Sequence, residues 1–397
     1  MHTWQRRHLS DLCSTITVGH VSSMTSEYVS RGVPFLRSKN VKPGRLDLSD
    51  LVFTRESFHQ RLKKSQLRAN DIVIVRTGTP GSAALIPKEL GPANCSDIII
   101  ARPGEHVNPR FLCYAINATA GSFVAAHTVG AVQQHFNIGS ARKLQILTPP
   151  RAEQQAIAEI LGALDDKIAA NERIISTTRE LGKSMFRAHV EGPNHQLTRL
   201  TEITTGLMRG GAPKYTDPKS GMVVVNQKCV RRGRIDLERA RHTAPTQVRG
   251  DRLLSYGDVL VNSTGVGTLG RVGRWDHDID ATVDSHVTIV RFDFGVVAPI
   301  IGAYALFAAQ PRIEAMGEGS TGQTELSRIK LGQLVVTLPS GDLSGDLADS
   351  LTALEHAARA RLDEIRTLEK LRDTLLPQLV TGKLRIKDVE STVEAVV

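Results

Sequence analysis

The sequence predicts an α+β protein: two similar mixed α/β domains separated by two long antiparallel coiled-coil helices, with the halves related by a pseudo-twofold internal repeat. Three observations predict this fold. Segments of the first half recur about 190 residues later in the same order, a heptad pattern follows each globular stretch, and both globular stretches contain strand-like apolar runs. A repeat of this length is too large for a solenoid unit, so it indicates a duplicated module.

The repeat is clearest in two strand-and-turn segments. Residues 41–48 (VKPGRLDL) match residues 230–237 (VRRGRIDL), and residues 71–78 (DIVIVRTG) match residues 258–265 (DVLVNSTG). The offset between the copies drifts over a few residues, as changes in loop length would produce. We therefore expect one fold to occur twice.

Proline and glycine mark the boundaries between the expected elements. Pro149-Pro150 precedes the first helix, where proline is tolerated in the first turn, and Gly192-Pro193 ends it. Pro377 falls inside the second apolar pattern, so we expect a kink or break there. The predicted segments are a first domain over 1–150, a helix over 151–192, a second domain over 193–340, a helix over 341–386 and a disordered tail over 387–397.

Both helical stretches carry apolar residues at alternating steps of four and three, over more than three heptads, which is typical of a coiled coil. The seam positions are Ile157, Leu161, Leu164, Ile168, Asn171, Ile175, Thr178, Gly182 and Met185 in the first helix, and Leu347, Leu351, Leu354, Ala358, Arg361, Ile365, Leu368, Arg372 and Leu375 in the second. Asn171 and Arg361 occupy matching positions. Either they determine the register of the seam, or they lie at an exposed edge.

Composition excludes several classes of protein. No apolar run reaches the roughly 18 residues of a membrane-spanning helix, and residues 1–7 lack a signal-peptide hydrophobic stretch, so we expect a cytoplasmic protein. The four cysteines stand far apart, without a C-x-x-C pair or regular spacing to histidine, which argues against a zinc site and a disulfide framework. These cysteines are Cys13, Cys95, Cys113 and Cys229.

The positive charge is concentrated in the two expected domains. Residues 1–150 hold 18 Lys and Arg against 9 Asp and Glu, and residues 193–340 hold 18 against 14, whereas both helical stretches are slightly acidic. Two basic modules on one chain are typical of a protein that places both on a polyanion. A basic surface without a nucleic-acid partner is the alternative.

Motifs for catalysis are weak or incomplete. Residues 265–270 (GVGTLG) fit G-x-G-x-x-G after a strand-like run, but a second strand-like stretch follows in place of the helix that would receive a phosphate. Residues 181–184 (LGKS) resemble the end of a P-loop but lack its upstream glycine. No cluster of carboxylates suggests a metal nuclease. We therefore expect no catalytic site and no metal site.

Three loops in each half carry side chains suited to DNA. Arg, Lys, Asn and Gln pair with base edges, while Ser, Thr and loop amides suit phosphates. The predicted DNA-binding residues are Arg37, Lys39, Asn40, Arg76, Thr77, Thr79, Gln133, Gln134 and Asn137 in the first half, and Asn226, Gln227, Lys228, Asn262, Ser263, Thr264 and Gln323 in the second. The alternative is that these are ordinary turns in which Asn and Thr cap local backbone.

Two segments carry a resemblance to a known family. Residues 371–386 (LRDTLLPQLVTGKLRI), together with Glu153-Gln-Gln155 after Pro149-Pro150, resemble conserved regions of the specificity subunits of type I restriction-modification systems. The resemblance extends over essentially the whole chain. It departs from the family at the start of the second helix, where residues 341–345 (GDLSG) replace the usual Pro-x-x-Glu-Gln.

The resemblance implies a non-catalytic DNA-recognition subunit for defence against foreign DNA. In that family each target-recognition domain reads one half of a bipartite, gapped target in double-stranded DNA, and the helices set the spacing and dock two methyltransferase subunits, which restriction subunits join. S-adenosylmethionine, ATP and Mg²⁺ would then belong to partner subunits. Two alternatives remain at this stage: a coiled-coil scaffold, or a cofactor-dependent DNA-modifying enzyme with a degenerate site.

Overall fold

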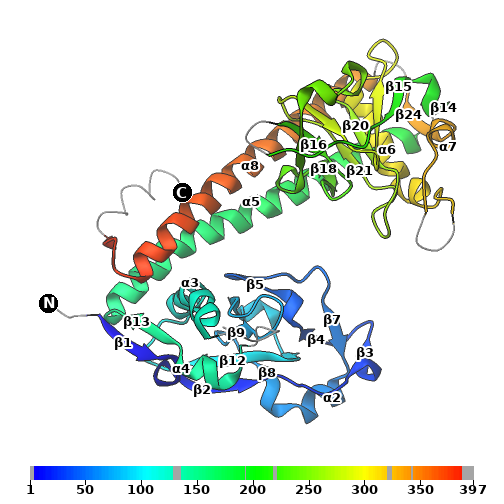
Figure 1. Ribbon diagram of the computed structural model, residues 1–397. Coiled ribbons are helices and arrows are strands. Elements are labelled where there is room, and N and C mark those ends of the chain that lie inside the picture. The colour runs from blue at the N-terminus through cyan, green and yellow to red at the C-terminus, as the bar shows by residue number, and fades with distance from the viewer. Residues whose placement is uncertain are drawn as a thin grey trace. The chain divides into compact units, whose positions relative to one another are not determined.

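The computed structural model describes residues 4–127, 136–192, 194–217, 221–319, 324–340 and 343–386. The chain divides into two compact units, each of which is described by itself. Unit 1 comprises residues 1–171 and 363–397, and unit 2 comprises residues 172–362. Each unit thus contains one α/β domain and one half of both long helices, coloured in Figure 1 by position along the chain. The tail predicted over 387–397 lies outside the described residues.

The centre of unit 1 is a four-stranded antiparallel sheet in the order β10-β9-β12-β2. Its strands are β2 (Cys13–Val18), β9 (Ile72–Val75), β10 (Ala83–Leu85) and β12 (Ile98–Pro103). The four residues of β9 read Ile-Val-Ile-Val and are all buried, which is the pattern of a strand covered on both faces. Helix α3 (Pro109–His127) packs against β10.

A second sheet of unit 1 has the order β3-β7-β4-β11-β8, in which only β4 and β11 are parallel. Its strands are β3 (Tyr28–Val29), β4 (Val33–Leu36), β7 (Val52–Thr54), β8 (Gln66–Leu67) and β11 (Ala93–Cys95). The remaining elements are two strand pairs, β1 (Gln5–His8) with β13 (Gln145–Thr148) and β5 (Val41–Lys42) with β6 (Arg45–Leu46), and the short helices α1 (Leu9–Leu12), α2 (Glu56–Arg61) and α4 (Ile138–Lys143).

Unit 2 repeats this architecture with a larger main sheet, in the order β15-β23-β20-β21-β18-β17. Its strands are β15 (Thr204–Arg209), β17 (Val230–Arg231), β18 (Gly233–Ile235), β20 (Val259–Asn262), β21 (Val272–Arg274) and β23 (Val287–Phe292). A smaller sheet joins β16 (Met222–Val225), β19 (Arg241–Thr243) and β22 (Ala281–Val283), and β14 (His195–Arg199) pairs with β24 (Val335–Pro339). The helices of this domain are α6 (Pro299–Glu314) and α7 (Arg328–Gly332).

The two domains share details that confirm the internal repeat. The hairpin partners Val41 and Leu46 of unit 1 correspond to Val230 and Ile235 of unit 2. Each unit contains one parallel pair in its second sheet, β4 with β11 and β16 with β22. Each also buries an equivalent ion pair, Asp71 with Arg102 and Asp258 with Arg291. A duplication of one fold accounts for all three.

The long helices are α5 (Arg151–Glu191) and α8 (Leu343–Val380). In unit 1, Asp165 accepts a hydrogen bond from Arg372 at 3.0 Å, and Lys167 lies 3.7 Å from Glu364. Residue numbers therefore increase along α5 in the direction in which they decrease along α8, so the helices are antiparallel there. In unit 2, Leu347 and Leu351 of α8 join Phe186 of α5 in the core of the domain.

Two expectations about the helices need correction. The break expected at Pro377 does not occur, because α8 continues past it to Val380. Gly382, with φ +68°, then turns the chain, and its N–H bonds to the Leu379 carbonyl. Asn171 and Arg361 are not alike: Asn171 is buried, whereas Arg361 is exposed. Only Asn171 lies where a polar group can restrict the register of the seam.

One tyrosine in each domain ties that domain to the long helices. The Tyr114 hydroxyl donates to Asp165 of α5 at 2.5 Å, and the equivalent Tyr304 hydroxyl donates to Glu355 of α8 at 2.9 Å. Burial raises the pKa of both phenols, and the neighbouring carboxylates raise it further. The hydroxyls therefore remain protonated donors, and the same contact positions both domains.

The Glu-Gln-Gln motif at the start of α5 also has an internal role. The Gln154 side chain is buried, accepts from the Asn108 N–H at 2.8 Å and donates to the Pro149 carbonyl at 2.9 Å. Asn108 also donates to Gln155 at 2.6 Å. This motif holds the first turn of α5 against its domain.

Among the described residues, no helix is both long and apolar enough to cross a membrane.

Candidate nucleic-acid interface

In unit 2, the loops that follow β16 and β20 meet at one end of the main sheet. The Thr264 hydroxyl lies 2.7 Å from His286 Nδ1 and 3.5 Å from the Gln227 side-chain carbonyl. Thr264 also forms a β-bridge with Glu325, which follows the predicted loop around residue 323. The sequence prediction grouped these three loops, and the structure brings their described parts together.

Two loops of unit 1 meet in the corresponding place. The Phe136 N–H donates to the Arg76 carbonyl at 2.9 Å, which joins the loop after β9 to the segment before α4. The Arg76 side chain forms an ion pair with Asp97, just before β12. Arg37 and Lys39 extend from the end of β4, and both pair with Asp50. Each domain therefore presents polar and cationic loops at the end of a sheet.

Four of the predicted DNA-binding residues are buried and serve their own loops. Asn40 donates to the Asp47 carbonyl at 2.9 Å, and Asn226 donates to the Arg239 carbonyl at 2.7 Å. Asn262 donates to two loop carbonyls at 2.9 and 3.0 Å, and the Ser263 hydroxyl lies 2.6 Å from Thr288. These side chains hold loop conformations, so they offer DNA little surface in this structure.

The other described members of the predicted DNA-binding set are either exposed or partly buried. Lys39, Thr77, Thr79, Asn137 and Lys228 are exposed, although Asn137 also caps α4 by accepting from the Ser140 N–H at 2.9 Å.

Partly buried members are Arg37, Arg76, Gln227 and Thr264, whereas Gln133, Gln134 and Gln323 lie outside the described residues. The accessible members are therefore the ones on which a DNA contact can be proposed.

Sequence reasoning missed several residues of the unit 2 edge. Arg209, the last residue of β15, pairs with Glu325 and donates to the Leu326 carbonyl at 2.6 Å. His286 touches Thr264, and its N–H donates to the buried carboxyl of Asp284 at 2.9 Å. Burial raises the pKa of Asp284, while the His286 N–H acts in the opposite direction. No motif marks these residues, because strand pairing brings them together.

The side chains at this edge are hydroxyl, amide, imidazole and guanidinium groups. Within the described ranges, no three His, Cys, Asp or Glu side chains gather in an arrangement that could hold a metal ion. The segment that fits G-x-G-x-x-G leads into β21, the strand predicted after it. Hydroxyl, amide, imidazole and guanidinium groups at loop tips are suited to hydrogen bonds with bases and phosphates.

The fold and this surface define an internally duplicated, basic protein in which two α/β domains are tied to paired long helices. Residues 1–178 match the family model of the type I restriction modification DNA specificity domain. The resemblance predicted from the sequence is thereby confirmed: the chain is similar to the specificity subunits of type I restriction-modification systems.

Three known proteins show how far the similarity extends. A protein named as the MjaX type I restriction enzyme specificity subunit of Methanocaldococcus jannaschii is 20% identical, over 97% of this chain and 94% of its own length. The EcoKI specificity subunit of Escherichia coli is 24% identical, over 57% of this chain and 54% of its own. The crystal structure of the type I S subunit from M. genitalium shares the fold, with a TM-score of 0.60 at 17% identity, covering 95% of this chain and 96% of that one.

Proposed function

We propose that this chain is the DNA sequence-recognition subunit of a type I restriction-modification complex. Each domain reads one half of a bipartite, gapped target in double-stranded DNA. The long helices set the separation of the two half-sites and dock two methyltransferase subunits. Base contacts at the loop tips supply specificity, and Lys and Arg contacts to phosphates supply affinity.

One observation carries this proposal: equivalent loops have the same scaffold and different exposed side chains. Asp71 and Asp258 open the equivalent strands with matching buried ion pairs. Gly78 and Gly265 turn the following loops with φ +90° and +107°. At the tips, however, Thr79 of unit 1 stands where unit 2 has Val266. One fold with two sets of tip residues suits the reading of two different half-sites.

Catalysis is assigned to partner subunits in this proposal. Methyltransferase subunits would bind S-adenosylmethionine and methylate adenine, and restriction subunits would use ATP and Mg²⁺ for cleavage. This chain would bind none of these cofactors. Tight binding of S-adenosylmethionine or ATP by the purified chain would instead favour an enzyme with a degenerate site.

The test is co-expression of the chain with the methyltransferase subunit of its own system in a bacterium that lacks DNA methylation, followed by mapping of modified adenines. We expect a gapped motif with two specific parts. Exchange of residues 193–340 for the equivalent domain of a relative should change one part only. A continuous motif would contradict reading by two domains, and methylation that is independent of the chain would favour a scaffold.

A further inference from the structure

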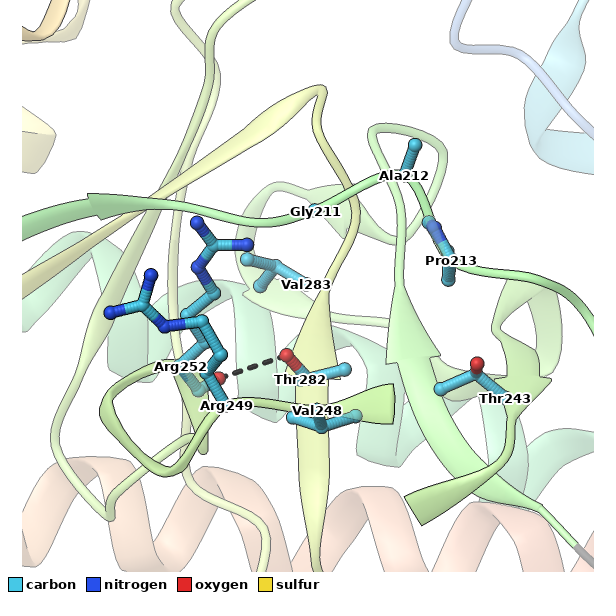
Figure 2. A pocket seen from close by; sticks show the side chains of 9 residues that line it. All are labelled: Gly211, Ala212, Pro213, Thr243, Val248, Arg249, Arg252, Thr282 and Val283. Carbon is cyan, nitrogen blue, oxygen red and sulfur yellow. Dashed lines mark hydrogen bonds between the residues drawn. The ribbon is translucent and has the colours of Figure 1, made fainter. Parts of the chain in front are cut away.

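A pocket on the second domain lies beside the proposed DNA surface and was not marked by any sequence motif. Its volume is about 60 Å³, and Figure 2 shows both of its arginine side chains on the same side, near Val283. The lining residues are Gly211, Ala212, Pro213, Thr243, Val248, Arg249, Arg252, Thr282 and Val283. Sites for small molecules usually measure about 300–1,000 Å³, so this pocket suits a group smaller than a nucleobase.

Arg252 supplies an available cation in this pocket. Arg249 is ion-paired with Asp251 at 3.3 Å, whereas the Arg252 guanidinium has no hydrogen bond or ion pair with any residue that the structure describes. The Arg252 backbone is held in place, because its carbonyl accepts from the Thr282 hydroxyl at 2.9 Å (Figure 2). A guanidinium presents several N–H donors in a planar fork that matches phosphate oxygens.

A glycine lets the guanidinium lie close to the main chain. A Cβ at Gly211 would lie 3.0 Å from Arg252 Nη1, which is shorter than most contacts that a Cβ atom makes in proteins. Arg241 adds further positive charge in the neighbouring sheet, where its guanidinium stacks 4.5 Å from the Tyr215 ring centre. The pocket therefore combines a glycine wall with two arginines in its lining, while Asp251 and Asp284 lie next to it.

The first domain lacks this arginine at the equivalent position. The N–H groups of Gly19 and Gly210 donate to the equivalent residues Ile98 and Val287, which aligns His20 with Gly211. His20 packs edge-on against Phe58 with ring centres 5.5 Å apart. The short 3₁₀ turn Lys63–Ser65 corresponds to Gly250–Arg252, so a serine stands where the second domain has Arg252. The repeat thus shows that this arginine is not required by the fold.

A chain of contacts joins the pocket to the proposed DNA surface. Gly211 forms a β-bridge with Asp284, whose N–H donates to the Val225 carbonyl at 3.0 Å, next to the predicted loop at 226–228. Asp284 also accepts from His286, which contacts Thr264. A duplex that meets the loop tips would bring its backbone near this pocket.

We propose that this pocket binds a backbone phosphate of the DNA held by the second domain, with Arg252 as the binding group. The inference rests on the proposed function. It adds an asymmetry between the two domains, since only the second has this arginine. A phosphate contact carries no base information, so Arg252 would contribute affinity and register and leave the recognised sequence unchanged.

The test compares Arg252→Gln with the unaltered full-length chain on a random-sequence 30-base-pair duplex, with the dissociation constant measured over a range of salt concentrations. Loss of one phosphate contact reduces the magnitude of the slope of log association constant against log salt by about 0.9. This corresponds to a roughly five- to tenfold weaker affinity near 0.1 M salt. The control variant is Arg312→Gln, which removes an exposed arginine of α6 outside the pocket. We expect it to change the slope by less than half as much.

Several outcomes would overturn the inference, and they separate it from the proposed function. If the unaltered chain binds the duplex and Arg252→Gln has the same slope, the phosphate site is wrong while DNA recognition stands. If the unaltered chain does not bind the duplex at all, both fail. Weaker binding of inorganic phosphate by Arg252→Gln, without a change on DNA, would identify a site for free phosphate. An unchanged thermal unfolding midpoint shows that the variant is folded.

Discussion

At the scale of single residues, the two tyrosines that tie the domains to the helices differ in their surroundings. Asp165, the partner of Tyr114, also accepts from Arg372 at 3.0 Å. Glu355, the partner of Tyr304, has no second hydrogen-bond donor among the residues that the structure describes. Removing the hydroxyl therefore leaves the half-buried Glu355 without a donor, whereas Asp165 keeps one.

Tyr304→Phe should consequently destabilise the protein more than Tyr114→Phe. A lost hydrogen bond to a charged group costs about 1.5–3 kcal/mol, and the cost at Tyr114 should be smaller because Asp165 keeps the Arg372 donor. We expect about 2 kcal/mol for Tyr304→Phe and about 1 kcal/mol for Tyr114→Phe, measured by urea unfolding. Tyr256→Phe is the control, because that exposed hydroxyl only meets His356 at 3.2 Å. Equal effects of all three changes would refute the proposed role of the ties.

The buried thiols predict how stability depends on alkaline pH. Burial raises the pKa of Cys13 and Cys113 to about 12 and that of Cys229 to about 11. In the unfolded chain these thiols ionise near pH 8.5. Since the unfolded chain then holds fewer protons than the folded one, this contribution to stability is complete below pH 8.5 and is lost as the pH rises toward 11 for Cys229 and toward 12 for Cys13 and Cys113.

Cys229→Ala should reduce this pH dependence. The free energy of unfolding of the unaltered protein should fall between pH 8.5 and 10.5, and the variant should lose about 1–2 kcal/mol less over that interval. The measurement is urea unfolding at several pH values under a reducing agent. Identical pH profiles for the two proteins would mean that the Cys229 thiol does not stay protonated in the fold.

At the scale of elements, the loop between β20 and β21 depends on glycines with positive φ. Gly267 and Gly270 have φ +68° and +78°. A Cβ at Gly270 would lie 2.6 Å from the Glu314 Cα at the end of α6, whereas a Cβ at Gly267 would meet nothing within 4 Å. Gly267 is thus required by its backbone conformation alone, whereas Gly270 is required also by its packing against α6.

Gly270→Ala should therefore be more destabilising than Gly267→Ala. Placing alanine in the left-handed region costs about 1–2 kcal/mol, and at Gly270 the clash with the α6 backbone adds to this cost. We expect at least 1 kcal/mol between the two variants in thermal or urea unfolding. If Gly267→Ala were the more harmful change, the packing of this loop against α6 would be wrong.

At the scale of the whole molecule, the duplicated architecture gives the long helices their proposed role as a spacer. One heptad adds about 10 Å to a helix, which is close to the rise of 3 base pairs. Inserting one heptad between Ile168 and Ile175 of α5 and one between Ala358 and Ile365 of α8 keeps the seam in phase, because these four seam residues are buried.

We expect this double insertion to lengthen the gap of the methylated motif by about 3 base pairs while both specific parts stay the same. The measurement is the same adenine mapping that tests the proposed function. Insertion into α5 alone puts the seam out of register and should abolish methylation. A change in the bases of either half-site would contradict the separation of reading from spacing.

Much of this architecture could be predicted before the structure. The matched segments at 41–48 and 230–237 became hairpins with equivalent registers, and the heptad pattern became α5 and α8. Such features are local, because spacing along the chain encodes them. The break expected at Pro377 was wrong, since helix propensity alone neglects the packing of Leu375, Leu379 and Val380 around it.

The candidate site was predicted less well, for a physical reason. Asparagine pairs equally well with a base edge and with a loop carbonyl, so its type did not reveal that Asn40, Asn226 and Asn262 are buried. Periodicity and residue type specify the repeat, the helices and the basic loops, so all three could be predicted. Which side chains remain accessible depends on tertiary packing, and strand pairing brought Arg209 and His286 beside the loops although no sequence pattern links them.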